Sequence, residues 1–298
     1  MLLAVDVRNR SIALGFHDGR GWILRRELGA MSDRSADEYG WFMERAFQEA
    51  KEKAGIGGEG SGAGVVDGLV AGDEKVDRAI VSSVAPILTP RIVAAISTAF
   101  GISAQVVGPG FKTGVKIRSD LPQEVGSDIV CSAAAARNLV AGAPCVIIDF
   151  GGAIVFSALN AEGDFVGAAI APGIETASFS LHAGAALLPQ AAFERPERAI
   201  GKTTRASIQA GLYYGYSGLV ERLAGLFRAE LAGSGANPAL IEVLVTGDPA
   251  GREFLRGLQP CRFVEALALE GLAIISERAG EAEGAKARQH GSKGAGTS

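Results

Sequence analysis

Two aspartates in this sequence follow short apolar runs and lead directly into tight turns. Asp6 follows Leu2–Val5, and Asp149 follows Cys145–Ile148 about half a chain later. Carboxylates at strand ends can hold a metal ion beside phosphate groups, and backbone N–H groups in glycine-containing turns can cradle phosphate oxygens. The recurrence therefore indicates a duplicated unit, although each copy alone is a common pattern and chance recurrence stays an alternative.

A third aspartate, Asp128, lies in the segment Gly126-Ser-Asp-Ile129. A carboxylate in such a position can accept the proton of an attacking hydroxyl group. It can equally be an acid at a helix N-terminus, stabilised by the helix dipole. Both interpretations remain open at this point.

The elements that must position these aspartates follow the same order in each half of the chain. Three strands separated by turns begin each half, and helices and a further strand follow. We expect strands at Leu2–Val5, Ser11–Phe16, Trp22–Leu24, Arg78–Ser83, Cys145–Ile148, Ile154–Asn160, Phe165–Ile170 and Val243–Val245, and helices at Ser35–Ala54, Thr89–Phe100, Gly173–Ala183, Thr204–Ala232 and Ala266–Arg278.

This order predicts an N-terminal half over residues 1–141 and a C-terminal half over residues 142–279. A glycine-rich stretch at about 55–75 reads as a loop within the first half. Residues 280–298 lack an apolar period and are predicted to be a disordered tail.

Composition excludes several classes of protein. The net charge of −4 gives no reason to expect a nucleic-acid surface. The three cysteines lie far apart in the sequence and lack the spacing of a disulfide framework or a zinc site. No signal peptide and no apolar run of membrane-spanning length is visible, so we expect a cytoplasmic protein without a membrane partner.

Several motifs, in this order and spacing, are typical of one family. The motifs are Gly108-Pro-Gly-Phe-Lys-Thr-Gly114, Pro122-Gln-Glu-Val-Gly-Ser-Asp128, Ile170-Ala-Pro-Gly173, Ile200-Gly-Lys-Thr-Thr204 and Gly211-Leu-Tyr-Tyr-Gly-Tyr216. With these motifs the chain resembles the type III pantothenate kinases, within the superfamily of sugar kinases, heat-shock ATPases and actin. The resemblance implies an α/β fold of two duplicated actin-like ATPase (ribonuclease-H-like) domains, each a mixed sheet flanked by helices.

The resemblance also implies an activity and its partners. Members of the family phosphorylate pantothenate with ATP in the first step of coenzyme A biosynthesis, as homodimers that use Mg²⁺ and a monovalent cation, K⁺ or NH₄⁺. Carried onto this sequence, Asp128 matches the general base, and Asp6 and Asp149 match the metal-binding carboxylates.

The first phosphate loop departs from the family pattern. It reads Asp6-Val7-Arg8-Asn9-Arg10, so Asp6 and Asn9 match, while Arg8 replaces a glycine and Arg10 a hydroxyl residue. We favour obstruction or altered phosphate binding, since Arg8 would strain a turn that needed glycine. Two alternatives stay open: Arg8 points outward without effect, or Arg8 and Arg10 form a different anion site.

Three further departures fall on groups that handle phosphate. The second phosphate loop keeps Gly151 but has Gly152, Ile154 and Val155 where the family has threonine or another hydroxyl residue. Ile129 stands in place of an arginine, whose charge and fork of donors isoleucine cannot replace. The adenine-side turn is Thr246-Gly247-Asp248 and carries an added carboxylate.

The segments that the resemblance assigns to pantothenate keep their pattern. They comprise Gly108, Gly110, Lys112, Thr113 and Gly114, together with Thr204. The glycines could instead form a plain turn, and Thr204 could be a helix N-cap. Either role is compatible with ligand binding.

Three functions remain open on the sequence. The first is a working pantothenate kinase, supported by the three aspartates and the pantothenate-side segments. The second is a pseudokinase that binds a small molecule or pairs with an active homologue, supported by the altered loops. The third is an interaction module without a ligand, which no specific feature supports.

Overall fold

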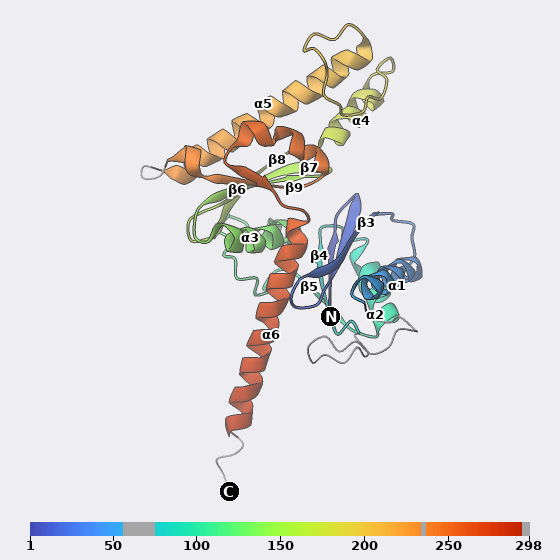
Figure 1. Cartoon of the computed structure of the whole chain (residues 1–298), viewed down its shortest axis with the longest axis vertical. Coiled ribbons are helices and arrows are strands. Elements are labelled where there is room, and N and C mark those ends of the chain that lie inside the picture. The colour runs from blue at the N-terminus through green and yellow to red at the C-terminus, as the bar shows by residue number, and fades with distance from the viewer. Residues whose placement is uncertain (56–74, 234–236, 294–298) are drawn as a thin grey trace. The chain divides into compact units, whose positions relative to one another are not determined.

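Each half of the chain forms a five-stranded sheet with the same strand order. The structure, a computed structural model, describes residues 1–55, 75–233 and 237–293 (Figure 1). The first sheet has the order β3-β2-β1-β4-β5 and the second the corresponding order β8-β7-β6-β9-β10. The strands are β1 Leu2–Val7, β2 Ser11–His17, β3 Trp22–Gly29, β4 Arg78–Ser83, β5 Ala104–Val106, β6 Cys145–Phe150, β7 Ala153–Leu159, β8 Phe165–Pro172, β9 Glu242–Gly247 and β10 Cys261–Phe263.

Strand directions in the two sheets match as well. The central strand β1 runs antiparallel to β2 and parallel to β4, and β6 runs antiparallel to β7 and parallel to β9. This agreement confirms the predicted duplication and the α/β fold of two actin-like domains with mixed sheets. The helices are α1 Ala36–Lys53, α2 Thr89–Phe100, α3 Ser127–Val140, α4 Ile174–Gly184, α5 Thr204–Ala232 and α6 Leu267–Lys293, with short 3-10 turns at Pro122–Glu124, Pro238–Leu240 and Pro249–Leu258.

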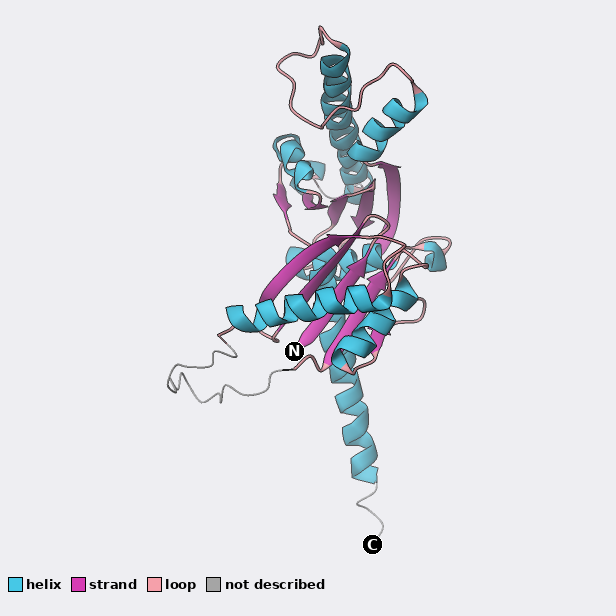
Figure 2. Cartoon of the chain, turned by 90° about the vertical axis from the view of Figure 1, so that its right-hand side faces the viewer, coloured by secondary structure: helices cyan, strands magenta, loops and turns pink. Residues whose placement is uncertain are grey.

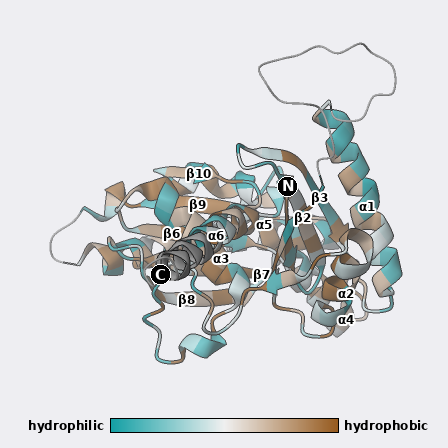
Figure 3. Ribbon diagram, turned by 90° about the horizontal axis from the view of Figure 1, so that it is seen from below, coloured by the Kyte–Doolittle hydropathy of each residue, from teal (hydrophilic) through white to brown (hydrophobic). Residues whose placement is uncertain are grey.

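Helices α1 and α2 pack together on one face of the first sheet; in Figure 2, α1 is the long helix that crosses the strands. The Ser35 hydroxyl accepts the Glu38 amide, and the Glu38 carboxylate accepts the Ser35 amide, which forms a capping box at the start of α1. Figure 3 shows that α1 carries both hydrophilic and hydrophobic residues. Its apolar residues, including Tyr39 and Met43, enter the core, as the helical spacing predicted.

The second sheet is covered by the long helix α5. Its residues Leu212, Tyr216 and Val220 pack against the apolar side chains of β6, β7 and β9. Tyr216 also donates a hydrogen bond to the Pro172 carbonyl oxygen at 2.8 Å, and its burial raises the pKa of the phenol. Tyr213 and Tyr216 thus serve packing, whereas Tyr214 is exposed.

The described chain divides into two units whose boundaries differ from the predicted residues 141 and 279. One unit comprises Met1–Gly114, Val125–Cys131 and Ala268–Ser298, and the other Val115–Glu124 and Ser132–Leu267. Helix α6 belongs with the first unit because Glu270 pairs with Arg25 of β3, and Gly271 lies directly against the Cys131 carbonyl. These contacts join residues far apart in sequence, so no local pattern indicates them.

Two segments were predicted to lack regular structure, one at about 55–75 and one at 280–298. The predicted glycine-rich loop at about 55–75 lies almost wholly outside the described residues. Where a disordered tail was predicted from residue 280, the structure continues α6 through Lys293. Alanine, glutamate, lysine and arginine dominate this stretch and are strong helix formers, which accounts for the difference.

Candidate functional site

The first unit gathers polar side chains around the buried thiol of Cys131. Asp6 on β1 pairs in register with Ser82 on β4, and the Ser82 hydroxyl lies 3.0 Å from that of Ser127. Burial raises the pKa of the Cys131 thiol well above its usual value, and the nearby charges of Asp6 and Asp128 raise this pKa further. A hydrogen bond with Ser82 lowers it by less. Cys131 therefore stays protonated and is no candidate nucleophile.

Ser127 fastens the start of α3 to the end of β4. Its hydroxyl accepts the Ser83 amide at 2.9 Å and lies 3.1 Å from the Ser83 carbonyl oxygen. The adjacent Asp128 turns one carboxylate oxygen to the Ile129 amide at 2.8 Å, within the first turn of the helix. Asp128 is thus a helix N-terminal acid by position, and a role in proton transfer is compatible with that position.

Replacing Ser127 by alanine is expected to destabilise the protein by about 1–3 kcal/mol, since the Ser82 hydroxyl and the Ser83 amide lose this buried partner. Urea unfolding followed by circular dichroism measures the change. The matched control is Ser132→Ala on the same helix, because the Ser132 hydroxyl is buried with no hydrogen-bond partner in the structure. The control is expected to be neutral or stabilising, and equal losses in both variants would contradict the anchoring role of Ser127.

Arg8 turns back onto Asp6. Its Nε donates a hydrogen bond to Asp6 Oδ2 at 2.7 Å, and its amide donates to the Ser11 carbonyl oxygen at 2.8 Å to close the turn between β1 and β2. Among the described non-glycine residues only Ala141 and Ala266 have a positive φ, so Arg8 sits in this turn without the strain expected from the loss of a glycine. The neighbouring Asn9 and Arg10 are exposed.

The segment predicted to bind pantothenate in this unit is a pair of tight turns. Gly110 and Gly114 have φ of 85° and 78°, which favours glycine at both positions. Thr113 is buried, and Arg278 of α6 contacts its carbonyl oxygen at 3.4 Å and fills the space beside Gly114. Lys112 is exposed. The backbone conformation alone therefore accounts for glycine at positions 110 and 114, and a contact with a ligand is compatible with it.

In the second unit, Asp149 lies against the turn that follows β9. Asp149 and Thr246 are register partners in the parallel pair β6 and β9. Gly247 has a φ of 85°, and a Cβ atom there would collide with the Phe150 carbonyl oxygen and press on the Asp149 carboxylate. The close approach of Asp149 to this turn therefore depends on glycine at position 247.

Two polar side chains of this turn are engaged in local structure. The Thr246 hydroxyl is buried and accepts the Leu267 amide at 3.2 Å. Asp248 accepts the Ala250 amide at 2.8 Å as the N-cap of the following 3-10 turn. The added carboxylate thus has a structural role in capping.

The second phosphate loop is a two-residue connection between β6 and β7. Gly151 and Gly152 are exposed, and their carbonyl oxygens lie so close to Gly173 that no side chain fits there. Thr176 of α4 donates a hydrogen bond to the Gly152 carbonyl oxygen at 2.7 Å. Ile154, at a position where the family has a hydroxyl residue, is fully buried in the core.

Thr204 begins helix α5 and is exposed. The N-cap is its neighbour Thr203, whose hydroxyl accepts the Ala206 amide at 3.2 Å. The alternative that Thr204 is itself the cap is therefore wrong by one position, because Thr203 has the extended backbone that a cap requires.

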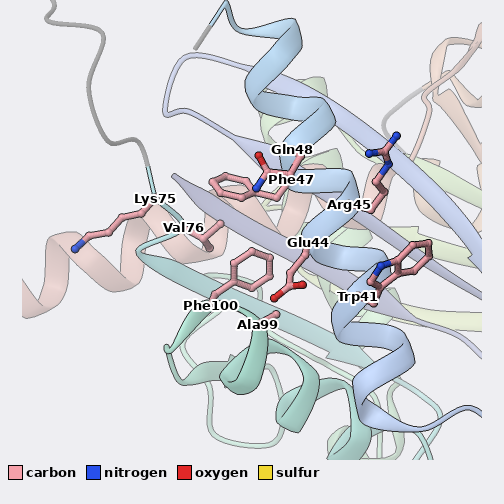
Figure 4. Close-up of a pocket in the computed structure, with 9 residues that line it drawn as sticks. All are labelled: Trp41, Glu44, Arg45, Phe47, Gln48, Lys75, Val76, Ala99 and Phe100. Carbon is pink, nitrogen blue, oxygen red and sulfur yellow. The ribbon is translucent and has the colours of Figure 1, made fainter. Parts of the chain in front are cut away.

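A pocket of about 590 Å³ lies elsewhere in the first unit, between α1, α2 and the segment before β4 (Figure 4). Phe47, Phe100 and Lys75 line it, together with Trp41, whose side chain is 68% exposed. It lies toward the N-terminal end of β4, whereas Ser82 lies toward the C-terminal end of that strand. None of the predicted site residues lines this pocket.

The structure thus places the predicted residues in two sets. The first unit contains Asp6, Arg8, Asn9, Arg10, Asp128 and the segment from Gly108 to Gly114, and the second contains Asp149, Gly151, Gly152, Thr204, Thr246 and Gly247. The sequence reasoning missed Ser82 and Cys131, which lie outside every motif, and the anchoring role of Ser127, which lies inside one. It also missed the pairing of Arg8 with Asp6, since Arg8 lies in the turn after β1, where no strand alternation fixes the direction of a side chain.

A divalent metal fits the residues at Asp6 poorly. The Arg8 guanidinium already neutralises this carboxylate, and within the described part of the chain no three histidine, cysteine, aspartate or glutamate side chains gather as a metal site. None of the described helices is long and apolar enough to cross a bilayer.

Comparisons with known proteins agree on one family. A family model described as type III pantothenate kinase matches residues 2–225. A type III pantothenate kinase of Dehalococcoides mccartyi strain CBDB1 is 38% identical over 230 residues, which cover 77% of this chain and 80% of the relative. One from Moorella thermoacetica is 36% identical over 285 residues, covering 93% and 99%. A solved structure described as a Baf family transcriptional activator from Campylobacter jejuni matches at 14% identity with a TM-score of 0.53, covering 93% of this chain and 99% of that one, which shows a shared fold alone.

Proposed function

Because the chain belongs to the type III pantothenate kinase family, we propose that it transfers the terminal phosphoryl group of ATP to the terminal hydroxyl of pantothenate. This reaction is the first step of coenzyme A biosynthesis, and we place it in the cytoplasm. The hydroxyl oxygen forms a bond to the γ-phosphorus, the bond to the β–γ bridging oxygen breaks, and ADP leaves.

The observation that carries this proposal is the position of Asp128. Its carboxylate lies at the start of α3, on a helix turn that Ser127 holds to β4. A carboxylate held in this way can accept the proton that the pantothenate hydroxyl loses as the new bond forms. We therefore propose Asp128 as the general base.

The nucleotide is proposed to lie along the loops of the second unit. The Gly151 amide already donates to the Ala153 carbonyl oxygen at 3.0 Å, so the exposed Gly152 is proposed to offer its backbone N–H to phosphate oxygens, and the turn at Thr246 and Gly247 is proposed to lie on the adenine side. Because the loop side chains lack hydroxyl groups, binding there depends on backbone donors. A weak affinity for ATP is expected, since each missing hydrogen bond to a charged group typically costs about 1.5–3 kcal/mol.

Pantothenate is proposed to contact the turns of the first unit. Gly108, Gly110, Lys112, Thr113 and Gly114 supply backbone groups, a hydroxyl and an ammonium that could meet its amide and carboxylate.

Kinase chemistry uses a divalent cation to neutralise phosphate charge. We propose Mg²⁺ for this role, with Asp149 beside it. The monovalent cation, K⁺ or NH₄⁺, is proposed from the family alone, and we assign no residue to it.

A homodimer is proposed because the second unit exposes large apolar side chains on neighbouring elements. Phe179 and Leu181 of α4 and Tyr214 of α5 are 55%, 42% and 45% exposed, and Leu187 and Ile200 between these helices are more exposed still. Several large apolar side chains exposed on two packed helices and the segment between them are typical of an interaction site. Sedimentation velocity is expected to show a dimer that Phe179→Asp weakens, and a monomeric parent chain would contradict the assignment.

A coupled assay tests the proposed reaction. With ATP, Mg²⁺, K⁺ and high protein concentration, ADP release is expected only when pantothenate is present, which separates transfer from simple ATP hydrolysis. If the folded protein releases no ADP in the presence of pantothenate, the kinase assignment is overturned. It would favour a pseudokinase that binds a small molecule or pairs with an active homologue, for which the Arg8–Asp6 pair is the supporting observation.

A further inference from the structure

Asp6 is a buried carboxylate on the central strand of its sheet. It pairs with Ala13 of β2 on one side and with Ser82 of β4 on the other, and its residue exposure is 1%. A buried charge of this kind must be compensated by an opposite charge or by hydrogen bonds. The group that compensates it determines what else this carboxylate can bind.

Arg8 supplies that compensation from the same strand end. Arg8 is the first residue after β1, and the hydrogen bond from its amide to the Ser11 carbonyl oxygen holds it in the turn two positions beyond Asp6. The contact is a charge-assisted hydrogen bond from Nε to Oδ2 at 2.7 Å, and the Arg8 side chain is itself only 22% exposed. The pair is local to one turn of one unit.

A divalent cation and this arginine compete for the same carboxylate. Mg²⁺ binds carboxylate oxygens at about 2.0–2.1 Å and keeps several water ligands around it. Oδ2 is already bonded to a guanidinium that stays charged at every working pH. The other oxygen, Oδ1, is buried and has no hydrogen-bond partner in the structure, so it offers a hydrated ion no open side.

We propose that Arg8 replaces a divalent metal ion at Asp6, so that Asp6 is an ion-pair partner and not a metal ligand in this chain. The positive charge that compensates Asp6 is then supplied by the Arg8 guanidinium and not by a bound metal ion. The proposal concerns these two residues alone and does not require the kinase reaction, so its failure and that of the proposed function are separate results.

Mn²⁺ binding to the full chain, followed by the electron paramagnetic resonance signal of free Mn²⁺, tests the proposal. Asp6→Asn is expected to change the Mn²⁺ affinity by less than about twofold while Arg8 is present. Arg8→Gln, which keeps the length of the side chain but not its charge, is expected to raise the affinity at least tenfold by freeing the carboxylate. The gain is expected to disappear in the double variant.

The matched control is Arg8→Lys, which keeps a positive charge beside Asp6 and is expected to bind Mn²⁺ as weakly as the parent chain. A tenfold loss of affinity in Asp6→Asn with Arg8 present would overturn the proposal. An unchanged affinity in Arg8→Gln would also overturn it. Circular dichroism would show whether Asp6→Asn folds. If it does not, the Mn²⁺ affinities of Arg8→Gln and Arg8→Lys are compared instead, and equal affinities would overturn the proposal.

Discussion

Replacing Asp128 by asparagine is expected to lower kcat for pantothenate phosphorylation by about 10²–10⁴-fold, the usual contribution of a general base. Asparagine keeps the shape of the side chain and can still accept the Ile129 amide, so the start of α3 should persist. KM for ATP is expected to change little, because the nucleotide is assigned to other residues. Steady-state rates with varied pantothenate and varied ATP measure both effects.

The matched control is Asp37→Asn. Asp37 is also an acidic residue in the first turn of a helix, but it is exposed on α1. Loss of a helix-dipole interaction costs both variants similar stability, about 0.3–1 kcal/mol. Activity should therefore fall only in the Asp128 variant. Equal activity in the two variants would mean that Asp128 is no more than a helix N-terminal acid.

The largest loss of stability is expected from Arg228→Met, at about 3–5 kcal/mol. Arg228 is buried on α5, where its Nε donates to the Ile241 carbonyl oxygen at 2.8 Å and its Nη2 donates to the carbonyl oxygens of Leu258 and Pro260. Methionine fills much of the same volume but leaves three carbonyl groups without this donor. The free energy of unfolding from urea titration measures the loss.

Arg222→Met on the same helix serves as the comparison, since Arg222 is exposed. Surface substitutions of this kind usually change stability by less than about 0.5 kcal/mol. A loss of the same small size at Arg228 would show that its hydrogen bonds are replaced by water after substitution. The interpretation of Arg228 as the link between α5 and the segments around β9 and β10 would then be wrong.

Much of the fold was predictable because its signals are local. Apolar runs of strand length, turns rich in glycine and the helical spacing in α1 each extend over a few residues, and they lead to the observed strands and helices with small shifts at the ends. The repeated strand, aspartate and turn at Asp6 and Asp149 predicted two equivalent sheets, which the shared strand order confirms.

The candidate site was predictable in part. The motifs led to the family, and the family led to Asp128, but Arg8 was read as strain or obstruction because the family has glycine there. The backbone has no positive φ at this position, so the expected strain is absent, while obstruction or altered phosphate binding stays a prediction. The Arg8 side chain bonds Asp6 from the turn that follows β1, and the direction of a side chain in a turn is decided by the folded backbone.

Short-range periodicity and turn chemistry in the sequence were enough for the order of elements, the duplicated architecture and the family. Only the folded chain decides that Ser127 anchors α3 to β4, that Arg228 binds three carbonyl oxygens, and that α6 packs with the first unit through Gly271. Each of these contacts joins segments distant in sequence. Their geometry depends on how whole elements pack, and burial then makes every such hydrogen bond costly to lose.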